Sequence, residues 1–302
     1  MKRFVWTILF AATLLLSLAA VASAQGRFCS TADVAGTWAY TETGTIFVPT
    51  GGVPYASVGK FTVDADGDLL GQRTASTGGT IQQATITGTA AINSDCTGTL
   101  TLAFYDPQSG SLLGEASKFI VYDDKLTEFR AIVTWAKLPD GTSVPTALFT
   151  DGKRIVPGRM ESDQEGTCST AGEAGTWGYT FTGTLMLPTG AIPFGGVGRA
   201  TIDADGNALN SQFSSSNGTV TWSTPKGAII VNPDCTAKAS ADIYDQNGNV
   251  LRKVDWFRVF DDNGNEMRGI LTSLVVVSSN TRVPAVVTMI GKRIFPGRGD
   301  EK

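Results

Sequence analysis

Residues 36–48 read GTWAYTETGTIFV, and residues 175–187 repeat the same pattern as GTWGYTFTGTLML. In both stretches, aromatic and aliphatic side chains alternate with small or hydroxylated ones, most of which are threonine. A period of two residues predicts a β-strand with one apolar face and one polar face. We expect the aromatic face to point into the core of the unit that each stretch opens.

The two stretches open two copies of one unit, which span residues 28–159 and 167–298. The recurring positions are Cys29, Trp38, Asp64, Cys96, Lys153 and Arg154, which return 139 positions later as Cys168, Trp177, Asp203, Cys235, Lys292 and Arg293. The offset falls to 138 between the turns at 106–111 and 139–143 and then recovers. Residues 160–166 link the copies, and residues 299–302 form a charged tail.

Nearly every segment of a copy predicts β-structure. In the first copy we expect strands near residues 37–48, 56–64, 68–76, 80–90, 97–105, 111–121, 126–137 and 145–156. Eight short antiparallel strands joined by tight turns predict a meander that closes into a barrel, because closure removes both exposed edges. The predicted fold is all-β, with two tandem antiparallel eight-stranded barrels, and a pair of β-sandwiches is the alternative.

Residues 1–24 have the features of a secretory signal peptide. Lys2 and Arg3 give a positive start, an apolar run follows over residues 4–20, and residues 22–24 (ASA) offer a cleavage site. The apolar run is short for a membrane-spanning helix, and no later stretch is long enough to be one. We therefore expect a secreted or periplasmic bacterial protein that has no integral membrane segment after cleavage.

Four cysteines in an exported chain predict disulfides rather than free thiols. Each copy has one cysteine at its start and one in its middle, so Cys29–Cys96 and Cys168–Cys235 are the economical pairs among three possible connectivities. Metal binding is the alternative. The wide spacing and the lack of histidine argue against it, and we predict neither a metal nor a cofactor.

The chain contains no histidine and is mildly acidic. Loss of Lys2 and Arg3 with the leader takes the formal charge from −4 to −6, which disfavours nucleic-acid binding. Without histidine, Ser-His and Cys-His nucleophile systems are excluded. An enzyme of this sequence would depend on carboxylates, Tyr, Lys or Arg, and the sequence favours a protein that is not an enzyme.

Residues 36–38 (GTW) open the first strand of copy one, and Arg154 lies on its last strand. A Gly-x-Trp on the first strand, with a cation from the last strand over the indole, resembles the calycin barrels (lipocalins and avidins). An eight-stranded meander without a helix also resembles the allene oxide cyclase-like barrel. The pattern around residues 232–236 (NPDCT) resembles secreted bacterial proteins of unassigned function. The calycin resemblance implies that Trp38 and Trp177 plug one end of each barrel.

The candidate ligand-binding residues lie on the aromatic faces of the two opening strands. They are Trp38, Tyr40 and Glu42 in copy one, and Trp177, Tyr179 and Phe181 in copy two. Glu42 is anomalous, since a carboxylate inside a barrel would be desolvated and could act as an acid or base. It is the one candidate catalytic residue. We favour instead a register shift near Gly44, or a place at the barrel mouth, which would leave Glu42 in water.

Two further charged motifs recur in both copies. Glu128 and Arg130 lie on one face of a strand whose other face, with Phe129, Ala131, Val133 and Trp135, is expected to be interior. We expect a solvent-exposed ion pair there, with a contact between the barrels as the alternative, because Glu266 and Arg268 repeat it. Residues 64–68 (DADGD) suggest calcium but lack the distal glutamate of an EF-hand, so a hairpin turn is predicted.

Three functions fit these patterns. The favoured one is a binding protein that holds a small apolar molecule in the barrel lumen, above the aromatic residues. A cell-envelope structural or adhesive protein with filled barrels is the second, and a cyclase- or isomerase-type enzyme around a buried Glu42 is the third. The copies differ where a lumen would be lined, with Glu42 against Phe181 and Thr150 against Met289. We expect the specific function to lie where the repeat breaks.

Overall fold

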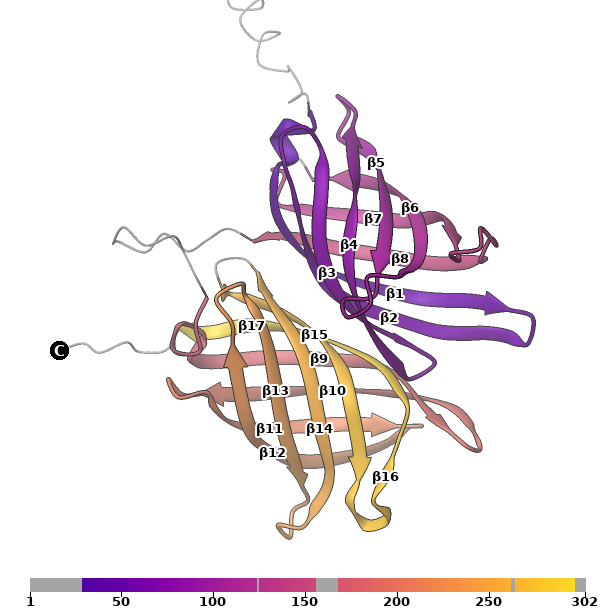
Figure 1. The fold of residues 1–302 in the computed structure, drawn as a ribbon. Coiled ribbons are helices and arrows are strands. Elements are labelled where there is room, and N and C mark those ends of the chain that lie inside the picture. The colour runs from indigo at the N-terminus through magenta and orange to yellow at the C-terminus, as the bar shows by residue number, and fades with distance from the viewer. Residues whose placement is uncertain (1–28, 124, 156–167, 262–263, 297–302) are drawn as a thin grey trace, which may run out of the picture.

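A computed structural model describes residues 29–123, 125–155, 168–261 and 264–296. It contains two antiparallel β-barrels in sequence, each of which is closed (Figure 1). The prediction of tandem eight-stranded barrels is confirmed, and the β-sandwich alternative is wrong because the first strand of each unit pairs with the last. The predicted signal peptide, linker and tail lie outside the described residues.

The first barrel follows the chain order, and each strand pairs with the next. Its strands are β1 (Gly36–Val48), β2 (Gly51–Val63), β3 (Asp68–Thr77), β4 (Thr80–Ile92), β5 (Thr97–Tyr105), β6 (Leu112–Tyr122), β7 (Glu128–Lys137) and β8 (Thr146–Ile155). A short 3-10 helix, η1 (Ala32–Val34), precedes β1. The second strand begins five residues before its predicted start, because Gly51 pairs with Val48 and the β1–β2 ladder extends as far as the turn.

The second barrel repeats this order. Its strands are β9 (Gly175–Leu187), β10 (Gly190–Ile202), β11 (Asn207–Ser216), β12 (Thr219–Val231), β13 (Thr236–Tyr244), β14 (Val250–Asp261), β15 (Glu266–Val276), β16 (Thr281–Arg282) and β17 (Ala285–Pro296). The 3-10 helix η2 (Ala171–Glu173) precedes β9, and η4 (Val277–Ser279) follows β15. The two-residue strand β16 pairs only with the end of β15, so eight strands form the wall.

One end of each barrel is sealed by a tryptophan and an arginine. Trp38 is fully buried, its Nε1 donates to the Val34 carbonyl at 3.0 Å, and the Arg154 guanidinium lies 4.9 Å from the ring centroid. Trp177 and Arg293 repeat the arrangement at 5.0 Å. The predicted end plugs are therefore present in both barrels.

Both predicted disulfides are formed, Cys29–Cys96 and Cys168–Cys235, each across 67 positions. Each ties the segment before the first strand to the turn before the fifth strand of its own barrel. Disulfides persist in oxidising compartments, so the pair indicates an extracytoplasmic environment. None of the helices in the described segments is long and apolar enough to cross a bilayer.

The aspartate-rich motif is a hairpin turn, as predicted. The Asp64 carboxylate accepts hydrogen bonds from the backbone N–H groups of Asp66 and Asp68 at 3.0 and 2.9 Å. Its four-residue loop joins β2 to β3. Among the described residues no cluster of three or more acidic, cysteine or histidine side chains could hold a metal ion.

The register of β7 shifts opposite Ser117 and Lys118. Trp135 pairs with Ser117 and Val133 pairs with Lys118, so Thr134 is an extra residue that bulges from the ladder. The bulge reverses the side on which the next residue points. Trp135 is therefore 39 % exposed, and its predicted interior position is wrong.

The barrels touch through their outer walls, where β2 meets β14, β15 and β17. Six buried aliphatic residues form this contact: Ala39, Ala56, Val58, Val259, Ile270 and Val286. At its margin Lys153 forms an ion pair with Glu266 at 2.9 Å, and Lys60 forms one with Asp234 at 2.9 Å.

The Glu–Arg motif thus has two environments. Glu128 and Arg130 are solvent-exposed as expected, whereas Glu266 and Arg268 are buried at the contact.

Candidate functional site

The interior of the first barrel is packed. Large buried side chains fill it from wall to wall, among them Phe61, Leu100, Leu102, Phe104 and Phe129. The remaining cavity beside Tyr40 has a volume of about 10 Å³. That is room for about one water molecule, so the first lumen cannot admit a ligand without rearrangement.

Glu42 points into this packed interior. It is 2 % exposed, and it accepts hydrogen bonds from the Lys118 ammonium and from the Thr150 hydroxyl, the latter at 2.9 Å. The expectation that a register shift leaves Glu42 in water is wrong, because β1 pairs without interruption on both sides through Gly44. Burial works to raise the pKa of Glu42, but Lys118 and Thr150 outweigh it and hold the pKa below its usual value.

All three members of this polar cluster are replaced by large apolar residues in the second barrel. Phe181 stands at the position of Glu42, and Met289 stands at the position of Thr150. Phe181 and Met289 pair across β9 and β17, just as Glu42 and Thr150 pair across β1 and β8. Trp256 stands at the position of Lys118. Trp256 pairs with Leu271 in the second barrel, and Lys118 pairs with the equivalent Val133 in the first. The second lumen therefore lacks the ion pair that fills the centre of the first.

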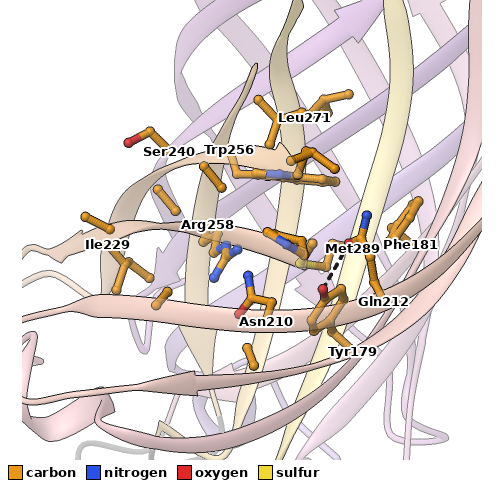
Figure 2. A pocket seen from close by; sticks show the side chains of 18 of the residues that line it. Tyr179, Phe181, Asn210, Gln212, Ile229, Ser240, Trp256, Arg258, Leu271 and Met289 are labelled. Atoms are coloured by element: carbon orange, nitrogen blue, oxygen red, sulfur yellow. Dashed lines mark hydrogen bonds between the residues drawn. The ribbon is translucent and has the colours of Figure 1, made fainter. Parts of the chain in front are cut away.

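The second barrel also loses bulk on its other walls. Ala200, Ala239 and Ala241 stand where the first barrel has Phe61, Leu100 and Leu102. These changes open a cavity between Tyr179, Phe181 and Trp256 (Figure 2). About 60 Å³ is accessible to the centre of a water molecule, within about 790 Å³ of space that is free of protein atoms and partly open to solvent.

Arg258 is the principal polar group of this cavity. It lies on β14 two residues after Trp256, where the first barrel has Ile120, and its Nη1 lies 3.6 Å from the Met267 sulfur. The side chain is partly exposed along the cavity, while its Nε is fully enclosed and has no hydrogen-bond partner. Burial lowers the pKa of Arg258 to about 10, and the nearby Tyr179 acts in the opposite direction, so the guanidinium is charged at neutral pH.

A second arginine and two amides share the lumen. Arg252 lies 5.7 Å from the Phe194 ring centroid, and burial lowers its pKa as well. Asn210 projects toward the same part of the lumen as Arg258 (Figure 2), and its buried Oδ1 has no hydrogen-bond partner. Tyr179 donates to the Gln212 Oε1 at 3.0 Å.

No acid among the described residues balances the two arginines. Within the described part of the chain, neither Arg258 nor Arg252 has a carboxylate at ion-pair distance, and the cavity lining contains no Asp or Glu. Two cations in an apolar lumen without a counter-ion carry an uncompensated desolvation cost. An anion that entered the cavity would reduce that cost.

The structure brings together only part of the predicted ligand-binding set. Tyr179 and Phe181 line the cavity, and Trp177 lies beyond it as the end plug. Trp38, Tyr40 and Glu42 belong to the packed interior of the first barrel. The sequence analysis missed Trp256, Arg258 and Asn210. The available signal was the replacement of Ile120 by arginine and of Gly71 by asparagine at equivalent positions of the repeat.

A wider hollow of about 520 Å³ lies between the barrels, with Ile81 and Gln83 on one side and Ile230, Lys238 and Phe257 on the other. Its side chains are largely exposed, and none of its described polar atoms is buried without a partner. The lumen of the second barrel is therefore the better candidate site.

No family model matches the chain, and no curated protein matches it. Among solved structures, a protein of unknown function from the DUF3598 family of Nostoc punctiforme is similar at 11 % identity, with a TM-score of 0.26, over 88 % of this chain and 98 % of that one. A putative AttH from Nitrosomonas europaea is similar at 9 % identity, with a TM-score of 0.24, over 85 % of this chain and 93 % of that one.

Proposed function

We propose that the second barrel binds a small amphipathic anion, and that the first barrel is a filled scaffold. The carboxylate or similar group of the ligand sits at Arg258, and its apolar body lies among Phe181, Trp256 and Met289. The observation that carries the proposal is the pairing of a hollow apolar lumen with a guanidinium that has no acidic partner in the described part of the chain.

The charge of the ligand follows from the two arginines. A guanidinium binds a carboxylate through two parallel hydrogen bonds, and the partly exposed Arg258 side chain lines the cavity without a carboxylate partner among the described residues. Asn210 can orient its amide to donate to the same anion. A neutral ligand of the same shape would leave both cations without a counter-ion, so the site discriminates against it.

The size of the ligand follows from the cavity. Space of about 60 Å³ for the centre of a water molecule suits a compact body, such as one aromatic ring or a short alkyl chain. Tyr179, Phe181 and Trp256 offer ring faces to such a body. We choose phenylacetate and octanoate as probes, with phenylacetamide and octanol as their neutral counterparts.

The test is calorimetric titration of the purified chain with each probe, supported by the fluorescence of Trp256. We expect each carboxylate to bind about tenfold or more tightly than its neutral counterpart, the effect of a charge-assisted hydrogen bond. Arg258→Met should abolish this preference while the neutral probes bind as before. Arg130→Met, on the outer wall of the first barrel, is the matched control and should change neither affinity.

Two failures are distinguishable. If no probe binds, the lumen is not a binding site for molecules of this class, and the proposal is wrong. If both members of a pair bind equally to the unmodified chain, the lumen binds ligands but the role given to Arg258 is wrong.

Export to an oxidising compartment and descent from a calycin-like barrel are part of the same proposal. Two disulfides and the Trp–Arg plug of each barrel support them. Catalysis at Glu42 gains no support, because that carboxylate is paired with Lys118 in an interior without room for a substrate.

A further inference from the structure

The repeat gives each barrel the same two outer faces. We call the outer wall of the first three strands the leading face (β1–β3 or β9–β11). The outer wall of the last three long strands is the trailing face (β6–β8 or β14, β15 and β17). Inside the chain, the leading face of the first barrel packs on the trailing face of the second. Apart from the edge of β8 that contacts β14, the trailing face of the first barrel has no such partner within the described residues, and neither has the leading face of the second.

The free trailing face keeps three apolar residues of the buried one, and differs in having Ala147 at the position of Val286 and Phe149 at the position of Thr288. Phe119, Val121 and Ile132 of the first barrel occupy the positions of Phe257, Val259 and Ile270 of the second. Val259 and Ile270 are 0 % exposed at the contact, whereas Val121 and Ile132 are 42 % and 39 % exposed. Phe149, which pairs with Ile132, extends the exposed row onto β8. The first barrel thus shows to solvent a surface that the second barrel buries.

The free leading face also matches its buried counterpart. Val197 stands at the position of Val58, and the flanking residues Ala39 and Ala56 are replaced only by Gly178 and Gly195. Val58 is 0 % exposed and Val197 is 55 % exposed. Phe213 and Ile294 add exposed apolar area on the adjoining strands. Small residues are therefore kept at the positions of Ala39 and Ala56, whereas the larger Phe213 stands at the position of the buried Thr74.

The charged pairs at the margin of the contact recur as well. Lys153 and Glu266 form an ion pair between the barrels, and their counterparts are Lys292, which pairs with Gly178 at the edge of the free leading face, and Glu128 on the free trailing face. Within the chain Lys292 also pairs with Glu266 at 2.7 Å and Glu128 with Lys153 at 3.8 Å, so a contact between copies would share these pairs.

Lys60 and Asp234 form the other ion pair at this contact, and their counterparts are Arg199 and Asp95, both exposed. Lys60 and Arg199 lie on the leading faces, and Lys153 and Lys292 lie on β8 and β17, the strands that pair with β1 and β9. Glu128 and Glu266 lie on the trailing faces, whereas Asp95 and Asp234 lie in the turns before β5 and β13. Two free faces that pair in the manner of the intrachain contact would therefore bring opposite charges together at both margins.

We infer that these two free faces bind each other between copies of this chain, so that the second barrel of one copy packs on the first barrel of the next. The occupant of each free face is a second copy, because the intrachain contact already shows the same two surfaces packed together. The contact is heterologous, so it propagates head to tail and gives a closed ring or an extended row of barrels.

Sedimentation velocity of the purified chain over a range of concentrations tests the inference. We expect the mean mass to rise above that of one chain as concentration increases. Phe149→Asp blocks the free trailing face, and Val197→Asp blocks the free leading face. Each variant alone should remain at the mass of one chain. Leu70→Asp, an equally exposed apolar residue outside both free faces, is the control and should associate like the unmodified chain.

The decisive experiment mixes the two blocked variants in equal amounts. Each retains the face that the other has lost, so the mixture should form a species of two chains and nothing larger. A single-chain mass for the unmodified protein at every concentration would overturn the inference. So would a mixture that stays at one chain while the unmodified protein associates. If Val197→Asp does not fold, Arg199→Glu replaces it and should weaken association about tenfold by placing like charges together.

Discussion

Lys118 donates a hydrogen bond to Glu42 at the centre of the first barrel, and the same two positions in the second barrel are Trp256 and Phe181. One repeat has thus filled its lumen with an ion pair, while the other has lined it with aromatic rings. The ion pair therefore distinguishes the filled lumen of the first barrel from the hollow lumen of the second.

Removal of one member of the buried pair should destabilise the first barrel strongly. Glu42→Leu leaves Lys118 charged and unpaired in an apolar interior, so we expect the free energy of unfolding to fall by about 3–5 kcal/mol. Urea denaturation at neutral pH measures the change. Glu128→Leu, at the exposed pair with Arg130, should cost less than about 1 kcal/mol and serves as the control.

The two members of the pair should not behave additively. Glu42→Leu combined with Lys118→Met removes both charges, so the double variant should lose less stability than the sum of the single variants. Additive losses would show that the two side chains do not stabilise each other.

Glu173 should make stability depend on pH. Burial raises its pKa to about 7 from an ordinary value of 4.5, although Arg293 acts against the rise. The native carboxyl therefore binds more protons than the unfolded one between these values, and the free energy of unfolding falls as pH rises through this window. Glu173→Gln should remove about 3 kcal/mol of that fall in the free energy of unfolding. The difference between the pH–stability curves of the variant and the unmodified chain measures it.

The first copy has Val34 at the position of Glu173 and supplies the matched control. Val34→Ala should lower stability by the same amount at every pH between 4 and 8, because no titrating group is changed. A pH–stability curve that is the same for Glu173→Gln and for the unmodified chain would contradict the assignment of the raised pKa to Glu173.

Restoring bulk to the second lumen should close it. Ala239→Leu with Ala241→Leu reinstates the residues of the first barrel, so we expect phenylacetate binding to be lost and stability to rise by about 1–2 kcal/mol. Calorimetric titration and urea denaturation measure the two effects. Leu100→Ala, the reverse change in the first barrel, should cost about 2–5 kcal/mol without affecting binding. Undiminished binding by the filled variant would place the ligand outside the lumen.

The arginine over each tryptophan should resist conservative replacement. Arg154 donates to the carbonyls of Asp33 and Ala35 at 2.8 and 3.3 Å while it covers the Trp38 ring. Lysine can keep the charge but not this geometry, so Arg154→Lys should cost about 1–2 kcal/mol. Arg130→Lys on the outer wall is the control. Equal unfolding midpoints for the two variants would show that the plug needs only a charge.

The barrels could be predicted because the two features that define each strand, its alternating pattern and the turn that ends it, are local in the sequence. Alternation marks each strand, and a turn motif such as that at Asp64 marks its end, so neither needs a distant partner to be recognised. The repeat then confirms each assignment a second time. The boundaries that moved, such as the start at Gly51, depend on pairing between strands.

The site could not be predicted in the same way, because its residues acquire their roles from distant neighbours. Glu42 has no recognisable partner in the sequence, because Lys118 lies 76 positions away, across the barrel. Trp135 was placed on the wrong side by a single bulged residue at Thr134. Arg258 follows Arg252, Val254 and Trp256 on one side of a strand, a mixed pattern that does not reveal which side is interior.

The plug at the end of each barrel has a further consequence for how the chain folds. Trp38 on β1 lies opposite Arg154 on β8, so the seam joins the first and last strands of a unit. A barrel cannot close until its whole repeat has been synthesised, and until then β1 presents an open edge. The first barrel can complete its seam while the second is still being delivered. Each repeat is therefore a kinetic unit, and a chain that stops before residue 146 has no way to shut its only barrel.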